Sequence, residues 1–290
     1  MKKGLVVKAI ASFFYLEVDG NIIECKASTK LKQNKKSIIT GDYVMFDELT
    51  NYITEVCKRN NELVRPKIAN VNNAMLIFSA TQPNMNYGML DRMIVIMEYN
   101  NLETTIVITK MDLLNEVEAV AFKESIDYYS KIGYTVLFSD EDFEKIKEEI
   151  QKEKYVFTGQ TGVGKSTLIN KMIPGLDLKT QPISKALGRG KHSTREVTFY
   201  KFKDSYIIDT PGFSAIDLEL TSDMIRDNYV DFAKFALNCK FKPCNHINEP
   251  KCSVKDQLGN SYQYDRRYEN YVKIMDEGKK EKYEINKRHL

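Results

Sequence analysis

The sequence lacks any hydrophobic run close to the ~20 residues that a membrane-spanning helix needs. Its first residues, MKKGLVVKAIASFFYL, start with lysines and an apolar stretch, as a weak secretory signal does. Lys8 interrupts that stretch, Glu17 and Asp19 follow it, and a cleavage site of small residues is missing. We therefore expect a cytoplasmic protein that does not work in a membrane.

A strong charge of either sign is also missing. The 43 lysines and arginines nearly balance the 40 aspartates and glutamates, which leaves a formal net charge of +3. So small a basic excess permits an anionic partner without demanding one. Internal repeats and low-complexity linkers are absent too. With 290 residues, 42% of them hydrophobic, the chain has room for two or three domains that each bury a core.

Cysteine is scarce and odd in number, with five residues in the chain, which favours a metal site in a reducing compartment over a disulfide framework. Four potential ligands follow the spacing C-x4-C-x-H-x5-C, namely Cys239, Cys244, His246 and Cys252. Thiolates and an imidazole in a short loop suit tetrahedral Zn²⁺, and four protein ligands leave no position open for water. We predict one structural zinc ion. Buried unpaired cysteines are the alternative, but they would not explain the clustering.

The first 60 or so residues contain short apolar runs broken by turn residues. Five short strands, with a hairpin turn at Asp19-Gly20-Asn21, predict a small β-barrel. An OB-fold suits that strand count, and such barrels often bind RNA; a barrel used only for packing is the alternative. The positions expected to face inward are Val6, Phe13, Tyr15, Ile22, Val44, Phe46 and Ile53, with Cys25 and Cys57 as ordinary core residues.

The middle of the chain alternates long apolar runs with helical periods. Strands are predicted at residues 74–79, 104–109, 134–138, 155–158, 197–202 and 206–209. Helices are predicted at residues 90–99, 117–132 and 142–151. Strands spaced by helices indicate βαβ units and a mainly parallel sheet covered on both faces, which is typical of an α/β nucleotide-binding domain.

From about Thr221 onward the predicted strands stop. The cysteine cluster lies in a loop, and the chain ends in a polar helical run that begins at Ser261. Such a charged run is typical of a solvated helix face, with contact to RNA as the alternative. The expected C-terminal part is therefore mostly helical and holds the zinc site.

A phosphate-binding loop follows the strand at 155–158 and precedes a helical stretch. It matches GxxxxGK[ST] and comprises Gly159, Gln160, Thr161, Gly162, Val163, Gly164, Lys165, Ser166 and Thr167. Glycines let the loop wrap with its N–H groups inward, and the helix N-terminus adds positive potential. Lys165 is expected to reach the β and γ phosphates, and Ser166 to bind Mg²⁺. The alternative is an ordinary glycine-rich turn.

The phrase DTPG ends the strand at 206–209. Asp209 is expected to hold Mg²⁺ through water, and the Gly212 N–H to sense the γ-phosphate. Phe213 follows where a polar residue could have positioned the attacking water. Hydrolysis without a partner is therefore expected to be slow.

Between these two motifs lies a basic, glycine-rich segment, LGRGKHSTREV. Thr194 is the candidate hydroxyl for Mg²⁺ and the γ-phosphate, with Ser193 as its nearest competitor. His192 is a candidate for orienting the attacking water once a partner orders the segment. The alternative is a flexible surface loop.

A base-reading phrase follows the strand at 104–109 and comprises Thr109, Lys110, Met111 and Asp112. Asp112 could accept hydrogen bonds from N1–H and the 2-amino group of guanine, while the Lys110 stem covers the ring. Adenine offers no such pair of donors. Thr109 stands where Asn is usual, and Ser139 is a weaker candidate for a backbone contact to the base.

The base-reading phrase precedes the phosphate loop, which reverses the usual order and indicates a GTPase domain that has been circularly permuted. Two other classes stay open on the residues alone. A metabolic P-loop NTPase shares the phosphate loop but leaves TKMD unexplained. A non-enzymatic RNA-binding protein accounts for the barrel, the cysteine cluster and the basic tail.

Together, TKMD before GQTGVGKST, then GRGKHSTR, DTPGF and C-x4-C-x-H-x5-C resemble the circularly permuted ribosome-assembly GTPases called RsgA, also YjeQ or YloQ. The resemblance covers nearly the whole chain, including RPKIANV. It implies an OB-fold RNA-binding domain at 1–62, a permuted α/β GTPase domain at 63–220 and a mostly α zinc-binding domain at 221–290.

The same resemblance implies GTP hydrolysis with Mg²⁺ and one structural Zn²⁺. Its implied partners are GTP and GDP, the small ribosomal subunit with its 16S rRNA, and other assembly factors. The family's activity implies slow hydrolysis that the small subunit stimulates and that is coupled to release. We expect a monomer.

Overall fold

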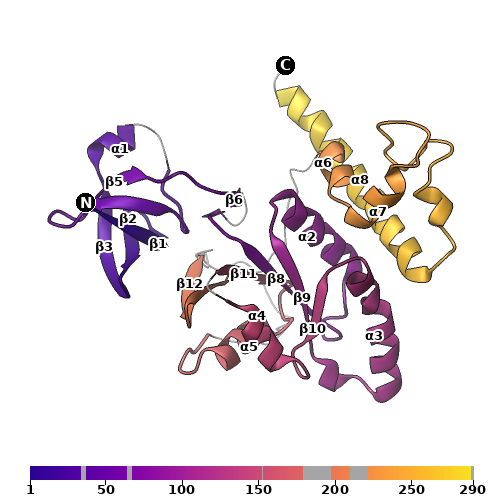
Figure 1. Ribbon diagram of the computed structural model, residues 1–290, viewed down its shortest axis with the longest axis horizontal. Coiled ribbons are helices and arrows are strands. Elements are labelled where there is room, and N and C mark those ends of the chain that lie inside the picture. The colour runs from indigo at the N-terminus through magenta and orange to yellow at the C-terminus, as the bar shows by residue number, and fades with distance from the viewer. Residues whose placement is uncertain (34–36, 64–66, 152, 179–196, 210–220, 289–290) are drawn as a thin grey trace, which may run out of the picture. The chain divides into compact units, whose positions relative to one another are not determined.

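The computed structural model describes residues 1–33, 37–63, 67–151, 153–178, 197–209 and 221–288 (Figure 1). The chain divides into two compact units, each assembled from two separate stretches of sequence. The first unit comprises Met1–Met75 and Glu144–Ser214, and the second comprises Leu76–Phe143 and Ala215–Leu290. Each unit has a hydrophobic core of its own.

The first unit begins with a closed five-stranded barrel in the order β1-β2-β3-β5-β4. Its strands are β1 (Lys2–Ile10), β2 (Phe13–Val18), β3 (Asn21–Ala27), β4 (Tyr43–Asp47) and β5 (Tyr52–Val56). The predicted hairpin turn lies between β2 and β3, where Asp19 and Gly20 have φ of 51° and 82°, as a tight two-residue turn requires. The barrel predicted from the sequence is confirmed.

The inward faces of the barrel were predicted correctly on three strands and wrongly on two. Val6, Val44, Phe46 and Ile53 are completely buried, as expected. Ile22 is instead 59% exposed, and Phe13 and Tyr15 are only half-buried. On β2 the neighbouring positions Phe14 and Leu16 are buried instead, and on β3 Cys25 is buried, as predicted for a core residue. In FFYLEV the first four residues are all apolar or aromatic, so alternation could not decide which set faces inward.

The unit also contains shorter elements. The helix α1 (Thr29–Gln33) lies between β3 and β4 of the barrel, and the strands β6 (Glu62–Leu63) and β7 (Ile68–Ala69) follow the barrel in the chain. Gly41 has φ of +90°, and a Cβ there would lie 2.0 Å from the Ala69 carbonyl oxygen. Only glycine therefore fits at this close approach. The completely buried Asp42 accepts hydrogen bonds from Arg59 Nε at 2.7 Å and Arg59 Nη2 at 2.8 Å.

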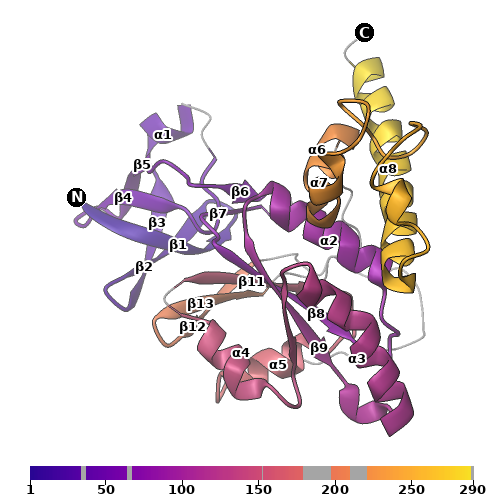
Figure 2. The same cartoon turned by 45° about the vertical axis from the view of Figure 1, so that its right-hand side comes forward.

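The rest of the first unit is α/β in character. It contains α4 (Phe143–Glu149), β11 (Lys154–Gly159), α5 (Lys165–Met172), β12 (Thr198–Phe202) and β13 (Ser205–Asp209). β11 and β13 run parallel, β12 pairs antiparallel with β13, and α5 packs on β11. Figure 2 shows α4 and α5 lying beside one another. All six residues of β11 are buried, which explains its continuous apolar run.

A buried lysine joins the barrel to β11 within this unit. Lys154 is 7% exposed; its Nζ donates to the Asn70 carbonyl at 3.1 Å and lies 4.3 Å from the centre of the Tyr43 ring. Burial lowers the pKa of Lys154 to about 8, from an ordinary value of 10.5. As the pH rises, Lys154 therefore loses its proton at a lower pH in the folded chain than in the unfolded chain.

Replacing Lys154 is expected to remove a pH dependence of stability. Between about pH 8 and pH 10.5 the unfolded chain binds more protons at this residue, so stability of the first unit should rise with pH there, by on the order of 2 kcal/mol. Lys154→Met should flatten that rise. The change in the midpoint of urea unfolding between pH 7.5 and pH 9.5 measures this rise. Lys201 is an exposed lysine of β12, so Lys201→Met is the matched control. If the midpoint changes equally with pH in both variants, this assignment is contradicted.

The second unit contains the end of β8 (Asn73–Ser79), together with β9 (Glu103–Thr109) and β10 (Thr135–Phe138). Its helices are α2 (Tyr87–Tyr99), η1 (Met111–Leu113), α3 (Glu116–Lys131), α6 (Ser222–Asp227), α7 (Val230–Ala236), η2 (Lys255–Gln257) and α8 (Tyr262–Arg288). β9 and β10 are parallel neighbours. A capping box between Asn115 and Glu118 starts α3, because both side chains satisfy otherwise unpaired N–H groups.

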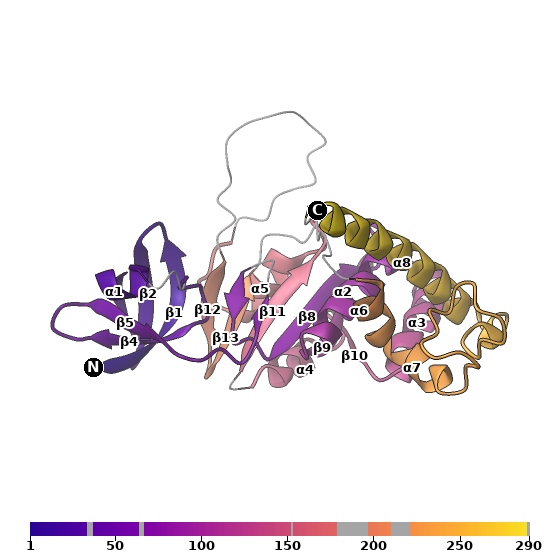
Figure 3. The ribbon, with the colours of Figure 1, turned by 90° about the horizontal axis from the view of Figure 1, so that it is seen from above.

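The C-terminal helix α8 packs against α2, α3 and α6, all within the second unit (Figure 3). The expectation of a solvated helix is wrong for its first half. Buried residues recur there every three or four positions and include Tyr264, Arg267, Tyr271 and Ile274, so one face of the helix belongs to a core. Across the part of the chain that is described, no helix is both long and apolar enough to cross a membrane.

Candidate nucleotide site and metal centre

The phosphate loop lies in the first unit, between the end of β11 and the start of α5, as predicted. Gly162 and Gly164 have φ of +83° and +94°, a region that glycine adopts without strain. Between them Val163 is completely buried and anchors the loop. Gly164 immediately precedes α5, so the loop leads directly into the positive end of a helix.

Two predicted residues from separate motifs meet at this loop. Lys165 Nζ lies 2.5 Å from Asp209 Oδ1, and their side chains are 12% and 23% exposed. β11 and β13 are parallel neighbours that end at the same edge, with Phe157 opposite Asp209. A cation and a carboxylate at a helix N-terminus are the groups that phosphate and Mg²⁺ require.

The base-reading phrase lies in the second unit, at the end of β9. Thr109 is buried; its hydroxyl donates to the Phe78 carbonyl at 3.3 Å, and its carbonyl accepts from the Ala80 N–H at 3.0 Å. Lys110 has φ of 61°, which turns the chain sharply away from the strand. Asp112 then lies exposed at the surface in η1. Thr109 thus ties two strands together, while Asp112 is presented to solvent.

A second acidic residue, which the sequence reasoning missed, holds this turn in place. Asp140 follows β10 and accepts hydrogen bonds from the Met111 N–H and the Ser139 hydroxyl, each at 3.1 Å. The Ser139 N–H is already donated to the Ile108 carbonyl at 2.8 Å. The signal in the sequence was an acidic residue two positions after the end of a predicted strand, beside the Ser139 that was singled out.

Three of the predicted site residues fall outside the described residues: His192, Thr194 and Gly212, together with the alternative Ser193 and the neighbouring Phe213. Their roles therefore stay predictions.

The cysteine cluster in the second unit has the geometry of a metal centre. Its four residues are all buried, and their ligand atoms all lie within 4.8 Å of one another. Cys239 Sγ lies 3.8 Å from Cys252 Sγ and 3.6 Å from His246 Nδ1, and His246 Nδ1 lies 3.3 Å from Cys252 Sγ. A tetrahedron with Zn–S bonds of about 2.3 Å has edges of about 3.8 Å between sulfurs. The donor set therefore fits one zinc ion.

The surroundings of the cluster orient His246 and keep out water. Glu249 accepts from the N–H groups of Asn245 and Ile247, which flank His246, and Tyr268 donates its hydroxyl to the His246 carbonyl at 2.6 Å. Burial raises the pKa of the Cys244 thiol to about 12 and lowers the pKa of His246. A bound cation is therefore needed to keep such thiolates charged, and the neutral imidazole is ready to act as a ligand.

A buried ion network joins α8, the helix that follows the metal centre, to α2 and α7. Arg267 of α8 is 1% exposed and pairs with Asp91 of α2 and with Asp231 of α7, the latter at 2.8 Å and 2.9 Å. Tyr128 of α3 donates to Asp231 at 3.0 Å, and Tyr129 donates to Asp91 at 2.7 Å. The two buried carboxylates thereby share one guanidinium as their counter-charge, and each also accepts a hydrogen bond from a tyrosine.

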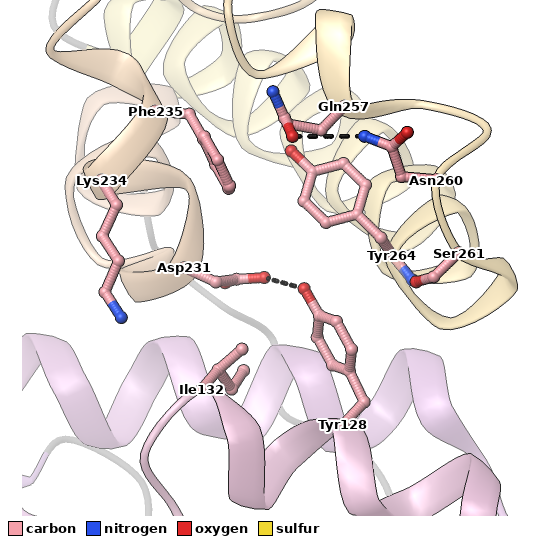
Figure 4. Close-up of a pocket in the computed structure, with 9 residues that line it drawn as sticks. All are labelled: Tyr128, Ile132, Asp231, Lys234, Phe235, Gln257, Asn260, Ser261 and Tyr264. Atoms are coloured by element: carbon pink, nitrogen blue, oxygen red, sulfur yellow. Dashed lines mark hydrogen bonds between the residues drawn. The ribbon is translucent and has the colours of Figure 1, made fainter.

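Figure 4 shows Tyr128 and Asp231 pointing toward each other at one end of a pocket of about 240 Å³. Ile132, Phe235 and Tyr264 supply its apolar walls. The Asp231 carboxylate is already engaged by Arg267 and Tyr128, so it does not offer the pocket an unpaired charge.

Comparison with known proteins agrees with this combination of barrel, phosphate loop and cysteine cluster. A family model described as RsgA GTPase matches residues 56–219, and one described as RsgA N-terminal domain matches residues 3–52. The chain belongs to the RsgA GTPase family. A third model, described as a 50S ribosome-binding GTPase, matches residues 154–286.

Curated relatives and solved structures of the RsgA type match over almost the whole chain. The small ribosomal subunit biogenesis GTPase RsgA of Bacillus cytotoxicus is 38% identical over 96% of this chain and 97% of its own. The protein of the same name from Enterococcus faecalis is 40% identical over 94% of both chains.

The crystal structure of YloQ, a circularly permuted GTPase, gives a TM-score of 0.78 at 32% identity and covers 96% of this chain and 95% of its own. That of YjeQ from Thermotoga maritima gives 0.80 at 32% identity and covers 95% and 98%. The predicted family and fold class are confirmed, and the protein is a GTP hydrolase.

Proposed function

We propose that this GTPase acts in the late maturation of the small ribosomal subunit. The observation that carries the proposal is the Lys165–Asp209 pair at the phosphate loop, in a chain that also has a barrel suited to RNA and a cysteine cluster suited to zinc. The relatives' printed name, small ribosomal subunit biogenesis GTPase, supplies the partner class. The protein would work in the cytoplasm on the 16S rRNA of that subunit, alongside other assembly factors.

The residues divide between base, phosphate and metal. Residues 109–112 would bind guanine, with Asp112 accepting from the base and Asp140 fixing the turn, while residues 159–167 would bind the phosphates. Ser166, Asp209 and Thr194 would hold Mg²⁺, and Gly212 would sense the γ-phosphate. The zinc ligands would be Cys239, Cys244, His246 and Cys252.

The mechanism needs charge stabilisation and a positioned water. Mg²⁺, when bound, neutralises charge that develops on the β and γ phosphates. Lys165 adds a cation at the same place, and the N–H groups of the loop supply fixed dipoles. No polar residue directly follows Gly212, so His192 would orient the water only when the partner orders its segment.

The three proposed domains, 1–62, 63–220 and 221–290, would then work in one cycle. The barrel and the zinc-binding part would contact rRNA while GTP is bound. Docking would complete the catalytic site, and hydrolysis would release the protein.

GTP turnover measured with purified ribosomal subunits tests this proposal. We expect slow turnover alone and a rise of about 10²-fold with the small subunit, the lower end of what one positioned catalytic group contributes. The large subunit is the matched control, because one matching family model is described as 50S ribosome-binding.

Two results would count against the proposal. Stimulation by the large subunit alone, or by neither subunit, would overturn the assigned partner. Displacement of labelled GDP by ATP as readily as by GTP would overturn the role of Asp112 and favour a metabolic NTPase.

A further inference from the structure

The loop between the first two cysteines of the cluster exposes an aromatic ring between two lysines. Lys240, Phe241 and Lys242 all lie at the surface, and Phe241 is 43% exposed. Other rings of this region, Tyr229, Phe232, Tyr264 and Tyr271, are buried in the core that surrounds the cysteines. Phe241 therefore does not serve that core, and an exposed ring at a loop tip is available for contact.

The loop is short and held at both ends. Cys239 and Cys244 bound it, and both are buried with the other ligands. The Lys240 N–H donates to the Lys251 carbonyl at 3.2 Å, which joins this loop to the one that precedes Cys252. A metal ion bound at the cluster would fix both loops, so the ring would be presented with little conformational freedom.

The charge beside the ring is positive. Lys251 is exposed like Lys240 and Lys242, and the Lys240 ammonium lies 5.5 Å from the centre of the Phe241 ring. Glu249 is the one acidic residue between Lys240 and Lys255. Its carboxylate is turned toward the N–H groups of Asn245 and Ile247. This loop region thus combines an exposed aromatic ring with three exposed lysines.

We propose that Phe241 is a stacking platform for an unpaired base of single-stranded RNA, with Lys240, Lys242 and Lys251 contacting the flanking phosphates. Every base presents a π-face to an aromatic ring, and lysines beside it neutralise the backbone. The inference rests on the proposed rRNA partner and adds the mode of contact: a flipped or looped-out base in place of a duplex.

Fluorescence tests the stacking directly, because the sequence contains no tryptophan and Phe241→Trp would introduce a single reporter. Titration of the full chain with a single-stranded RNA oligonucleotide about a dozen nucleotides long should quench that fluorescence. Tyr262→Trp is the matched control, since Tyr262 is 73% exposed in α8 outside the loop and should not be quenched. Equal quenching in both variants, or none in either, would overturn the proposal.

The affinity of the full chain for the same RNA oligonucleotide, now carrying a label, gives the second readout. Phe241→Ala and Phe241→Leu should each weaken it by about 5- to 100-fold, as the loss of one stacked base does, with unchanged salt dependence. Lys240→Ala with Lys242→Ala should reduce the salt slope by about 1.4. Zinc content and basal GTP turnover should stay as in the wild type.

The outcomes separate this proposal from the proposed function. A Phe241→Leu variant that binds RNA like the wild type while Phe241→Ala does not would indicate a general apolar contact and would reject stacking. Wild-type affinity in both variants, with small-subunit stimulation intact, would reject the platform alone. If the small subunit fails to stimulate GTP turnover by the wild-type protein, the proposed function is rejected instead.

Discussion

Removal of metal from the cysteine cluster is expected to unfold the C-terminal part of the second unit. Cys239, Cys244 and Cys252 are members of the core cluster that contains Tyr229, Phe232 and Tyr271. Without a cation, the thiols and the imidazole lose the bonds that hold the two loops together. Binding of zinc in small zinc-dependent folds contributes about 10–16 kcal/mol, more than the whole stability of many domains.

Near-ultraviolet circular dichroism measures this loss, because several tyrosines pack around the cluster. Chelation, or Cys252→Ser, should abolish the part of the tyrosine signal that comes from this core and release about one zinc per chain. Cys57→Ser is the matched control, since Cys57 lies in the first unit and is only half-buried. An unchanged spectrum after complete chelation would show that the cysteines pack as ordinary core residues.

Replacement of Lys165 is expected to have the largest effect on catalysis. Its ammonium lies beside Asp209 at the phosphate loop, where it would stabilise charge on the β and γ phosphates. Removing one such preorganised group costs about 10²–10³ in turnover. Lys165→Ala should therefore lose GTP turnover by at least that factor, both alone and with ribosomal subunits.

The fold should survive the Lys165→Ala change, because the pair with Asp209 is partly exposed and contributes little to stability. Lys171→Ala is a matched control near the other end of α5, and its turnover should stay within a factor of a few of the wild type. If Lys165→Ala hydrolysed GTP at the wild-type rate, the assignment of residues 159–167 as the phosphate site would fail.

Much of the fold could be predicted because local signals agreed with one another. The run YVFTG before GVGKST required both a buried strand and a glycine loop, and β11, Gly162 and Gly164 take those conformations. The spacing of Cys239 to Cys252 likewise left few arrangements other than a cluster. In each case a single short segment contained all the information.

The features that were missed depend on residues far apart in the sequence. Asp140 looked like an ordinary turn residue, and its contact with Met111 arises only because β9 and β10 are neighbours. Arg267 lies in a run of charges that is typical of a solvated helix, yet it pairs with Asp91, 176 residues away. On β2 the sequence was apolar on both faces, so only closure of the barrel decides which side is buried.

The network around Arg267 implies that the second unit opens as one cooperative body. Its guanidinium pairs with both Asp91 from α2 and Asp231 from α7. Detaching α8 alone would leave both carboxylates buried without their counter-charge, which costs several kcal/mol. Detaching α2 or α7 alone would break the charge-assisted hydrogen bonds that Arg267 makes to that helix. Amides of α2, α7 and the first half of α8 should therefore share one opening free energy in hydrogen exchange. Loss of structure at the cysteine cluster would then also destabilise α2, which carries no metal ligand.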